Sequence, residues 1–489
     1  MAVHPSYAVA RWWFLRLLGV VYLIAFVSLW TQIDGLIGRQ GILPAQHLLE
    51  AARRQLGPER YWLLPTVCWF NASDGVLQGL CAAGSAVSVL LLFDAAPALA
   101  LGLLWALYLS LATVCQDFLS FQWDNLLLEI GLLAVFLAPL RLRPRPLVDD
   151  APPSPAILWL LRWLLFRLMF SSGIVKLASG DPAWRTLAAL TYHYETQPLP
   201  TWIGWWAHQL PAAAQRVSCV AMFVIELAVP WLIFGPRRTR DAAACALIVL
   251  QALIALTGNY CFFNVLTVML CLLLLDDAVW PAWAAPRAVS RMGIAQDRRS
   301  GRWPGWVIGP VAGAILVLTA VEMSGLVIRR IPWPAPVIQL VRWASPFRSV
   351  NGYGLFAVMT TKRSEIIVEG SDDGEHWKAY EFRDKPGGLS RRPRFVAPHQ
   401  PRLDWQMWFA ALGGYQDTRW FLPFCGRLLE GSPAVLALLA STPFPGAPPR
   451  YLRAVVYVYH FTDSATRRAT GHWWRREERG VYCPVVSLR

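Results

Sequence analysis

The chain has 489 residues, of which 56% are hydrophobic and 16% are charged. This composition excludes a disordered chain, and the charged fraction lies well below the about one quarter that is usual for soluble proteins. The formal net charge of +14 would suit nucleic-acid binding, but the arginines lie in short segments between long apolar blocks, not on one polar stretch with interleaved aromatic residues. The sequence therefore predicts an integral membrane protein in contact with membrane lipid, and no nucleic-acid partner.

Nine apolar blocks approach the roughly 20 residues that a helix needs to cross the hydrocarbon core. They span residues 12–31, 76–93, 97–115, 123–140, 157–176, 213–234, 242–257, 260–275 and 306–328. The first block is longer than the apolar part of a secretory signal peptide and has no small-residue cleavage signature. We therefore expect it to be a retained signal anchor.

Residues 242–275 fit either one over-long helix or two spans that turn at Gly258 and Asn259. With two spans and a cytoplasmic N-terminus, the arginine clusters that follow residues 140, 234 and 275 all lie on the cytoplasmic side, as the positive-inside rule requires. These clusters are Arg141, Arg143 and Arg145; Arg237, Arg238 and Arg240; and Arg298, Arg299 and Arg302. The charges thus favour nine spans, although Arg329 and Arg330 at the outer end of the last span argue the other way.

This topology divides the chain into a transmembrane helical domain, 1–330, with outer loops at 32–75 and 179–212, and a soluble domain, 331–489, on the outer face. In the soluble domain, residues 364–369 and 376–382 flank an Asp-Gly turn and are typical of a hairpin, and residues 454–461 are typical of a further strand. Residues 405–412 and 433–439 favour short helices. The predicted fold class is an α-helical polytopic membrane protein with a C-terminal β-rich soluble domain.

Ionisable residues inside membrane spans are costly and usually mark ion pairs, pathways or sites. Arg167 and Glu226 lie roughly 15 Å and 12 Å from the inner ends of their spans, which predicts an ion pair near the midplane. Lys176 and Asp124 are likewise matched in depth near the outer boundary. Either pair could serve a site or only lock helices together, and Lys176 could be a general base or an interfacial lysine.

The loop after Lys176 is rich in aromatic and polar residues, and we predict a polar cluster at the outer face of the membrane. Within it, His193 and Glu195 could form an acid/base pair or could hydrogen-bond the loop to nearby helix ends. The cluster comprises Asp124, Glu129, Lys176, Asp181, Trp184, Arg185, His193, Glu195, Asn259 and Asn264. The chain has no zinc-type cysteine spacing and no recognised catalytic motif, so no metal and no cofactor is predicted. Cys425 and Cys483 could pair in an oxidising compartment.

Several runs of residues closely resemble the lipase maturation factor family. In the membrane part they are SFQWD at 120–124, FRLMFSSG at 166–173, SGDPAWR at 179–185, YHYETQPLP at 192–200 and NYCFFN at 259–264. In the soluble part they are NGYGLF at 351–356, VEGS at 368–371, APHQPRLDWQMW at 397–408 and GHWW at 471–474. The resemblance covers nearly the whole chain.

The resemblance implies a non-enzymatic membrane protein that assists the folding and assembly of exported client proteins, lipases in particular. We therefore predict client contacts at Trp405, Trp408, Trp473 and Trp474, the alternative being that these rings form the core of the soluble domain. If the protein is eukaryotic, the resemblance implies the endoplasmic reticulum membrane, with a lumenal soluble domain. The excess of arginine over lysine instead favours a bacterial inner membrane with a periplasmic domain.

A fainter similarity reaches the membrane part of the vitamin K-dependent γ-carboxylases, through Gly173, Lys176 with Leu177, and Asp181 with Trp184. That similarity implies a second hypothesis, an integral-membrane enzyme that acts on a lipophilic cofactor or substrate. Lys176 would be its general base, with Asp124, Asp181 and His193 around it.

Overall fold

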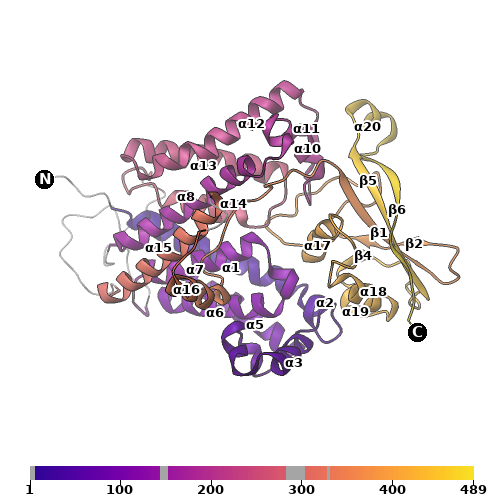
Figure 1. The fold of residues 1–489 in the computed structure, drawn as a ribbon, viewed down its shortest axis with the longest axis horizontal. Helices are drawn as coiled ribbons and strands as arrows, with labels where there is room; N and C mark the ends of the chain where they lie inside the picture. Colours follow the sequence, from indigo (N-terminus) through magenta and orange to yellow (C-terminus); the bar gives the residue numbers. More distant parts are fainter. Residues whose placement is uncertain (1–5, 144–151, 282, 284–302, 328–330, 489) are drawn as a thin grey trace.

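The computed structural model describes residues 6–143, 152–281, 283, 303–327 and 331–488. Arg145, Arg298, Arg299, Arg302, Arg329 and Arg330, which entered the topology argument, lie outside these residues. A bundle of long helices forms one side of the molecule, and the strands and short helices of the C-terminal part lie on the other (Figure 1).

Seven helices within the described residues are long and apolar enough to cross a membrane. They are α1 (Ala8–Trp30), α5 (Asp74–Leu92), α6 (Pro97–Val114), α8 (Pro155–Ala178), α12 (Ala212–Leu227) continued by the 3₁₀ helix η5 (Val229–Phe234), α13 (Arg237–Thr257) and α15 (Gly305–Val327). Pro230, which has no backbone N–H, lies where α12 gives way to η5. The chain is therefore an integral membrane protein with a polytopic helical part, as the hydropathy predicts.

The other two predicted spans form shorter helices, α7 (Gln122–Leu137) and α14 (Phe263–Leu272). Residues 242–275 are broken into α13 and α14, and the chain leaves the helix at Gly258 and Asn259, where the sequence placed the turn. Of the nine predicted spans, seven are thus long helices and two, α7 and α14, are shorter. At about 1.5 Å per residue, the ten residues of α14 cover only about half of the hydrocarbon core.

Short helices fill the segments between the long ones. The first such segment carries α2 (Ile33–Ile37), α3 (Ala45–Gln55) and α4 (Arg60–Leu63); the second carries α9 (Pro182–Arg185), α10 (Ala189–Thr196) and α11 (Trp202–His208). After α15 the chain forms α16 (Ala335–Ala344) and then enters the C-terminal part. The helices α10 and α11 lie at the end of α12 that is nearest the C-terminal strands (Figure 1).

A four-stranded antiparallel sheet in the order β2-β1-β5-β6 forms the far side of the C-terminal part. Its strands are β1 (Arg363–Ser371), β2 (Lys378–Ala379), β5 (Tyr451–Phe461) and β6 (Trp474–Val486), and β3 (Glu381–Phe382) pairs with β4 (Leu439–Ser441). The predicted hairpin is confirmed as β1 and β2, and the predicted strand 454–461 lies in β5.

Helices α17 (Arg402–Ala410), α18 (Phe421–Leu429) and α19 (Pro433–Leu436) lie between the sheet and the membrane helices, whereas α20 (Ser464–Thr470) projects at the far end (Figure 1). The predicted helix at 405–412 overlaps α17, which begins earlier and ends at Ala410. The one at 433–439 is shortened to α19, and Leu439 begins β4.

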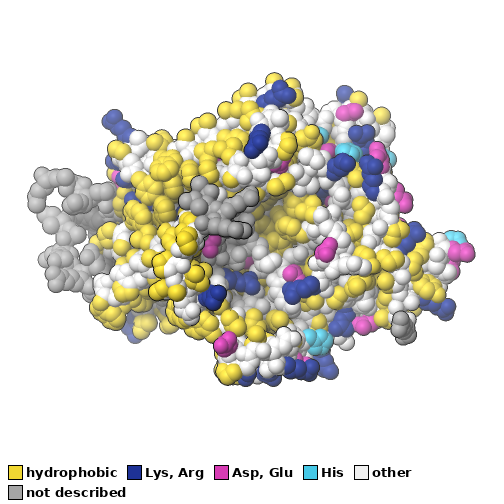
Figure 2. All heavy atoms as spheres, in the orientation of Figure 1, with side chains coloured by type: hydrophobic (Ala, Val, Ile, Leu, Met, Phe, Trp, Pro, Cys, Tyr) yellow, Lys and Arg dark blue, Asp and Glu magenta, His cyan; other side chains and the backbone are white. Residues whose placement is uncertain are grey.

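Apolar side chains gather over α12, α13 and α15, whereas charged side chains gather over the C-terminal part (Figure 2). Val217, Val220 and Val224 on α12 are all exposed. A helical bundle in a membrane presents such an apolar surface to the surrounding lipid chains.

Candidate functional site

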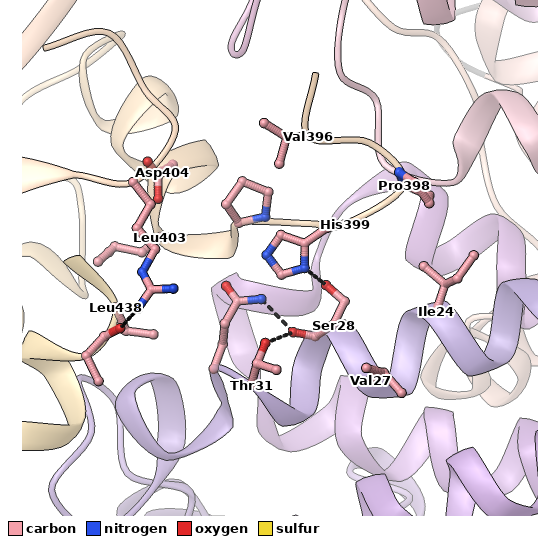
Figure 3. Close-up of a pocket in the computed structure, with 14 residues that line it drawn as sticks. Ile24, Val27, Ser28, Thr31, Val396, Pro398, His399, Leu403, Asp404 and Leu438 are labelled. Carbon is pink, nitrogen blue, oxygen red and sulfur yellow. Dashed lines mark hydrogen bonds between the residues drawn. The ribbon is translucent and has the colours of Figure 1, made fainter. Parts of the chain in front are cut away.

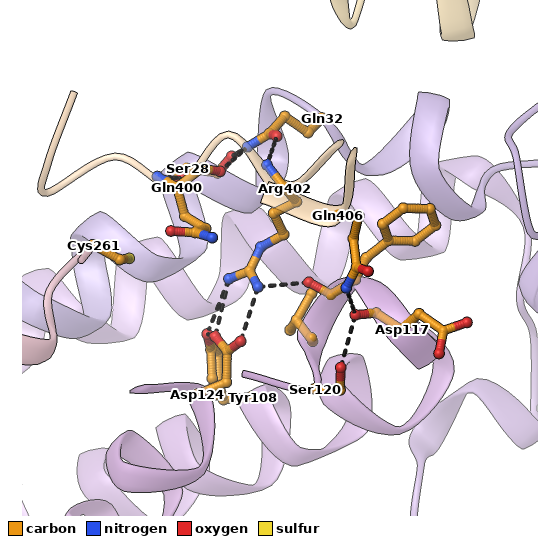
Figure 4. Close-up of polar contacts among 12 residues, drawn as sticks. Ser28, Gln32, Tyr108, Asp117, Ser120, Asp124, Cys261, Gln400, Arg402 and Gln406 are labelled. Atoms are coloured by element: carbon orange, nitrogen blue, oxygen red, sulfur yellow. Dashed lines mark hydrogen bonds and ion pairs between the residues drawn. The ribbon is translucent and has the colours of Figure 1, made fainter. Parts of the chain in front are cut away.

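Arg402, the first residue of α17, extends from the C-terminal part into the helical bundle and forms an ion pair with Asp124 of α7 (Figure 4). Its two terminal nitrogens lie 2.9 Å and 3.0 Å from the two Asp124 carboxylate oxygens. Tyr108 Oη also donates to Asp124, at 2.5 Å, and Arg402 donates to the carbonyl of Phe118 at 2.7 Å. Both charged side chains are fully buried, so this two-point ion pair joins the two parts of the molecule.

A second buried group centres on Glu129, five residues further along α7. Arg167 of α8 pairs with it, Tyr353 Oη donates to it at 2.6 Å, and the backbone N–H of Asn351 donates at 3.2 Å. The predicted pair of Arg167 with Glu226 is therefore wrong. Matched depth places two residues at one level of the bundle but does not decide which faces of their helices meet.

Glu226 instead pairs with Lys176. Lys176 Nζ donates to the two carboxylate oxygens of Glu226 at 2.9 Å and 2.7 Å and to the carbonyl of Ser172 at 3.0 Å. The expected match of Lys176 with Asp124 is also wrong, because Asp124 is held by Arg402. An ammonium carries three hydrogens, and here all three have acceptors, which does not suit a general base.

The proposed outer-face cluster divides into separate contacts. Asp181 caps α9 through the N–H of Ala183 and accepts the N–H of Met359. Glu195 accepts the N–H of Phe461 at 3.0 Å, at the end of β5.

Asn259 donates to the carbonyls of Leu199 and Arg394 and accepts from the N–H groups of Val396 and Ala397. It therefore fixes the end of α13 to a loop of the C-terminal part. Arg185 of the same predicted cluster is exposed on α9. These residues join loops to helix and strand ends, and Asp124, Asp181, His193 and Lys176 do not assemble into one catalytic site.

Four members of the predicted cluster do line one cavity, of about 510 Å³, together with Glu226. They are Lys176, Trp184, His193 and Asn264. The Lys176 nitrogen lies 5.4 Å from the centre of the Trp184 ring. The sequence thus found part of this cavity's polar lining, although not its ion pair.

A second cavity, of about 420 Å³, lies at the junction of α1 with the loop before α17 (Figure 3). His399 Nδ1 lies 2.9 Å from Ser28 Oγ, and Ser28 Oγ accepts the N–H of Gln400. Burial raises the pKa of Asp404 to about 6 and lowers the pKa of His399 below its ordinary value. The cavity thus combines a neutral imidazole with apolar walls from Ile24 and Leu438.

Sequence reasoning missed Arg402 and His399 as functional residues. Both lie within the run at 397–408 that carries the family resemblance, and this was the available signal. Nothing in the spacing of these residues shows that the run inserts into the bundle, because their partners Asp124 and Ser28 are 278 and 371 positions away.

The four tryptophans predicted as client contacts are largely internal. Trp405, Trp408 and Trp474 are buried, and Trp473 packs beside Trp205. Trp408 Nε1 donates to the carbonyl of Thr196 at 2.8 Å, and the Trp405 ring lies against Trp123. Their rings fill the domain core and its boundary with the bundle, so they offer little surface to a client. Cys425 and Cys483 are both buried free thiols, so the pair left open by the sequence is not formed.

Two family models match the chain. The lipase maturation factor transmembrane domain matches residues 9–282, and the lipase maturation factor C-terminal domain matches residues 349–484. Lipase maturation factor 2 of Gallus gallus is 39% identical, over 97% of this chain and 81% of that relative. The Homo sapiens protein of the same name is 38% identical, over 97% and 82%.

Lipase maturation factor 1 of Bos taurus is 34% identical, over 97% of this chain and 88% of that relative. No solved structure matches the chain. The matches cover both the helical bundle and the C-terminal part that Arg402 and Asp124 join. The chain therefore belongs to the lipase maturation factor family.

Proposed function

We propose that this chain is a membrane-anchored maturation factor that assists the folding or assembly of exported proteins, lipases among them. The observation that carries the proposal is the identity of 39% to a lipase maturation factor over 97% of the chain. Two named domains of the family, one transmembrane and one C-terminal, are both present. The chain thus has the parts that such a role requires.

The role requires the C-terminal part to lie on the lumenal side of the endoplasmic reticulum membrane, where exported proteins fold. The vertebrate origin of the relatives supports this compartment and gives no support to a bacterial inner membrane. We propose that the C-terminal part is lumenal, and the positive-inside count over the nine predicted spans supports the same side.

We propose that clients bind at the cavity of about 420 Å³ between α1 and the loop before α17, and not at the buried tryptophans. The cavity has apolar walls and a few polar groups, among them the imidazole of His399, which is the usual composition of a ligand-binding site. Thr31 is exposed at its edge, and its hydroxyl donates only to the carbonyl of Ser28 among the described residues. A side chain enlarged at Thr31 therefore obstructs the cavity with little cost to the fold.

The proposal is tested by deleting the gene and measuring the specific activity of each secreted lipase, with secreted proteins that are not lipases as controls. We expect lipase specific activity to fall while the controls are secreted normally, and wild-type chain to restore it. Thr31→Trp is expected to restore it poorly, whereas Glu50→Trp, on the exposed side of α3, is expected to restore it fully. Unchanged lipase activity after the deletion would disprove the maturation role, and full rescue by Thr31→Trp would disprove the assigned contact.

A further inference from the structure

The cavity beside Lys176 has the size and lining of a ligand site. Its volume of about 510 Å³ lies within the roughly 300–1,000 Å³ of small-molecule sites. Helices α8, α12, α13 and α14 and the short helices α10 and α11 all contribute to it. Most of its wall is apolar, including Leu168, Met222, Leu250, Ile254 and Phe263.

The mouth of this cavity lies among helices that cross the membrane. Ser218 on α12 and Leu253 on α13 both line the cavity and are both exposed, and Leu253 is 56% exposed. Trp206 and Leu210, at the end of α11, complete the exposed rim. Because α12 and α13 are membrane helices, a molecule that enters between them comes from the lipid phase.

His193 lines the cavity, and its Nδ1 carries a lone pair that can accept a hydrogen bond. Gln197 uses its amide hydrogens on the carbonyls of Tyr194 and Thr257, so its oxygen must accept the hydrogen of Tyr260 Oη. Tyr260 therefore has no hydrogen left for His193 Nε2, 3.3 Å away, and Nε2 must be the protonated nitrogen. Burial, with the Lys176 ammonium, lowers the pKa of His193 to about 4, which keeps the ring neutral and Nδ1 unprotonated.

A second polar group lies on α13 and α14. Asn264 Nδ2 donates to Gln251 Oε1 at 2.8 Å, and both side chains are buried. Gln251 Nε2 has one partner among the described residues, the weakly accepting Met169 sulfur at 3.7 Å. The cavity thus offers a hydrogen-bond donor here in addition to the acceptor at His193.

The charges in the cavity compensate each other. Lys176 and Glu226 form a closed pair, and the three hydrogens of the ammonium are all engaged. A carboxylate or phosphate head group would have to displace Glu226 or lie beside it, and neither is favourable in a buried site. A hydroxyl, which both donates and accepts, satisfies His193 and Gln251 without any added charge.

We propose that this cavity binds an uncharged membrane lipid with a hydroxyl-bearing head group, such as a monoacylglycerol or diacylglycerol. The head group lies between His193 and Gln251, and the acyl chain extends along the apolar wall toward the opening between α12 and α13. This binding site is independent of the maturation role, and its test requires no lipase.

The test uses the full chain in phosphatidylcholine nanodiscs and a photoreactive diazirine analogue of monooleoylglycerol. We expect the label to fall on peptides of α8, α12 or α13. Unlabelled monooleoylglycerol should compete at least about tenfold better than methyl oleate or oleate, because each lost hydrogen bond weakens binding roughly threefold to tenfold. Competition by oleate as strong as that by monooleoylglycerol would overturn the proposal. Equally strong competition by added phosphatidylcholine would overturn it too.

Two variants connect the label to this cavity. Ser218→Trp fills the rim and should abolish specific labelling, whereas Val217→Trp, its exposed neighbour that does not line the cavity, should label as wild type does. His193→Phe should reduce the advantage of monooleoylglycerol over methyl oleate by roughly threefold to tenfold. Equal weakening of both competitors would show that His193 acts only on the fold, and wild-type labelling of Ser218→Trp would place the lipid elsewhere.

Discussion

The buried guanidinium of Arg402 and the carboxylate of Asp124 each depend on the other for a counter-charge. Replacing both members of such a pair by uncharged groups of similar shape is often nearly neutral, whereas removing one member leaves a buried charge without compensation. The stability lost on a single substitution therefore arises mainly from the remaining charge, which stays buried without its counter-charge.

Arg402→Gln or Asp124→Asn alone is expected to lower the free energy of unfolding by about 3–5 kcal/mol. The double variant should recover a substantial part of that loss, since it leaves no buried charge. Tryptophan fluorescence during unfolding in detergent measures this, and Arg468→Gln on the exposed face of α20 is the control. Additive losses in the double variant would contradict the account.

Asp404 makes the stability of the fold depend on pH, and the direction of its pKa shift gives the sign. Its pKa of about 6 exceeds the about 3.9 of an unfolded chain, so the folded state holds the proton more tightly. The resulting stabilisation is complete below about pH 4 and is lost as the pH rises through about 6, a change of roughly 3 kcal/mol.

Asp404→Asn cannot ionise, yet it keeps an oxygen for the N–H groups of Asp384 and Lys385. The Tm of the wild type relative to this variant should therefore fall between pH 4 and pH 7. If the difference in Tm between wild type and Asp404→Asn does not change between pH 4 and pH 7, the raised pKa of Asp404 is refuted.

At the scale of elements, close packing of α1 and α5 depends on a glycine. A Cβ on Gly84 would lie 2.4 Å from the ring of Phe26, which is fully buried beside Tyr22 and Tyr108. A methyl group at this position forces the ring out of its packed place.

Gly84→Ala is therefore expected to destabilise the fold by about 1–3 kcal/mol. Gly79 lies on the same helix with open space around it, so Gly79→Ala should leave stability unchanged or raise it by up to about 1 kcal/mol. Thermal unfolding of the two variants side by side in detergent checks the difference in sign, and equal shifts would contradict it.

The sequence predicts elements better than it predicts contacts. Apolar length located the long helices, and loop charge correctly broke 242–275 at Gly258 and Asn259. The strand β6 was missed because residues 475–479 on this sheet edge are all charged and exposed, which removes the apolar alternation.

The ion pairs were mispaired for a different reason. Lys176 and Glu226 were both identified as membrane residues, but their pairing depends on helix rotation, which depth does not encode. The partner of Asp124 came from outside the membrane domain altogether, where no search for buried pairs among the spans could find it.

For the whole molecule, the proposed function depends on the side of the membrane that carries the C-terminal part. Arg468→Asn creates an Asn-x-Thr acceptor with Ala469 and Thr470 on α20, where position 468 is exposed and the helix projects at one end of the C-terminal part (Figure 1). Expressed in mammalian cells, this variant should gain a glycan that endoglycosidase H removes.

The matched control is Arg237→Asn, which creates the same kind of acceptor with Arg238 and Thr239 at the opposite end of the bundle and should remain unmodified. A glycan on the control and none on α20 would reverse the topology, and the maturation role would then fail.

The pairing of Arg402 with Asp124 can form only late in synthesis, because Arg402 is made long after Asp124. Arg402 follows Asp124 by 278 positions, which the ribosome covers in roughly 15–55 seconds at about 5–20 residues per second. During that interval Asp124 in a newly inserted bundle lacks the guanidinium that pairs with it in the finished fold. A chain that ends before α17 never acquires Arg402, so its Asp124 stays unpaired within the membrane. This unpaired acid distinguishes an incomplete product from the finished protein.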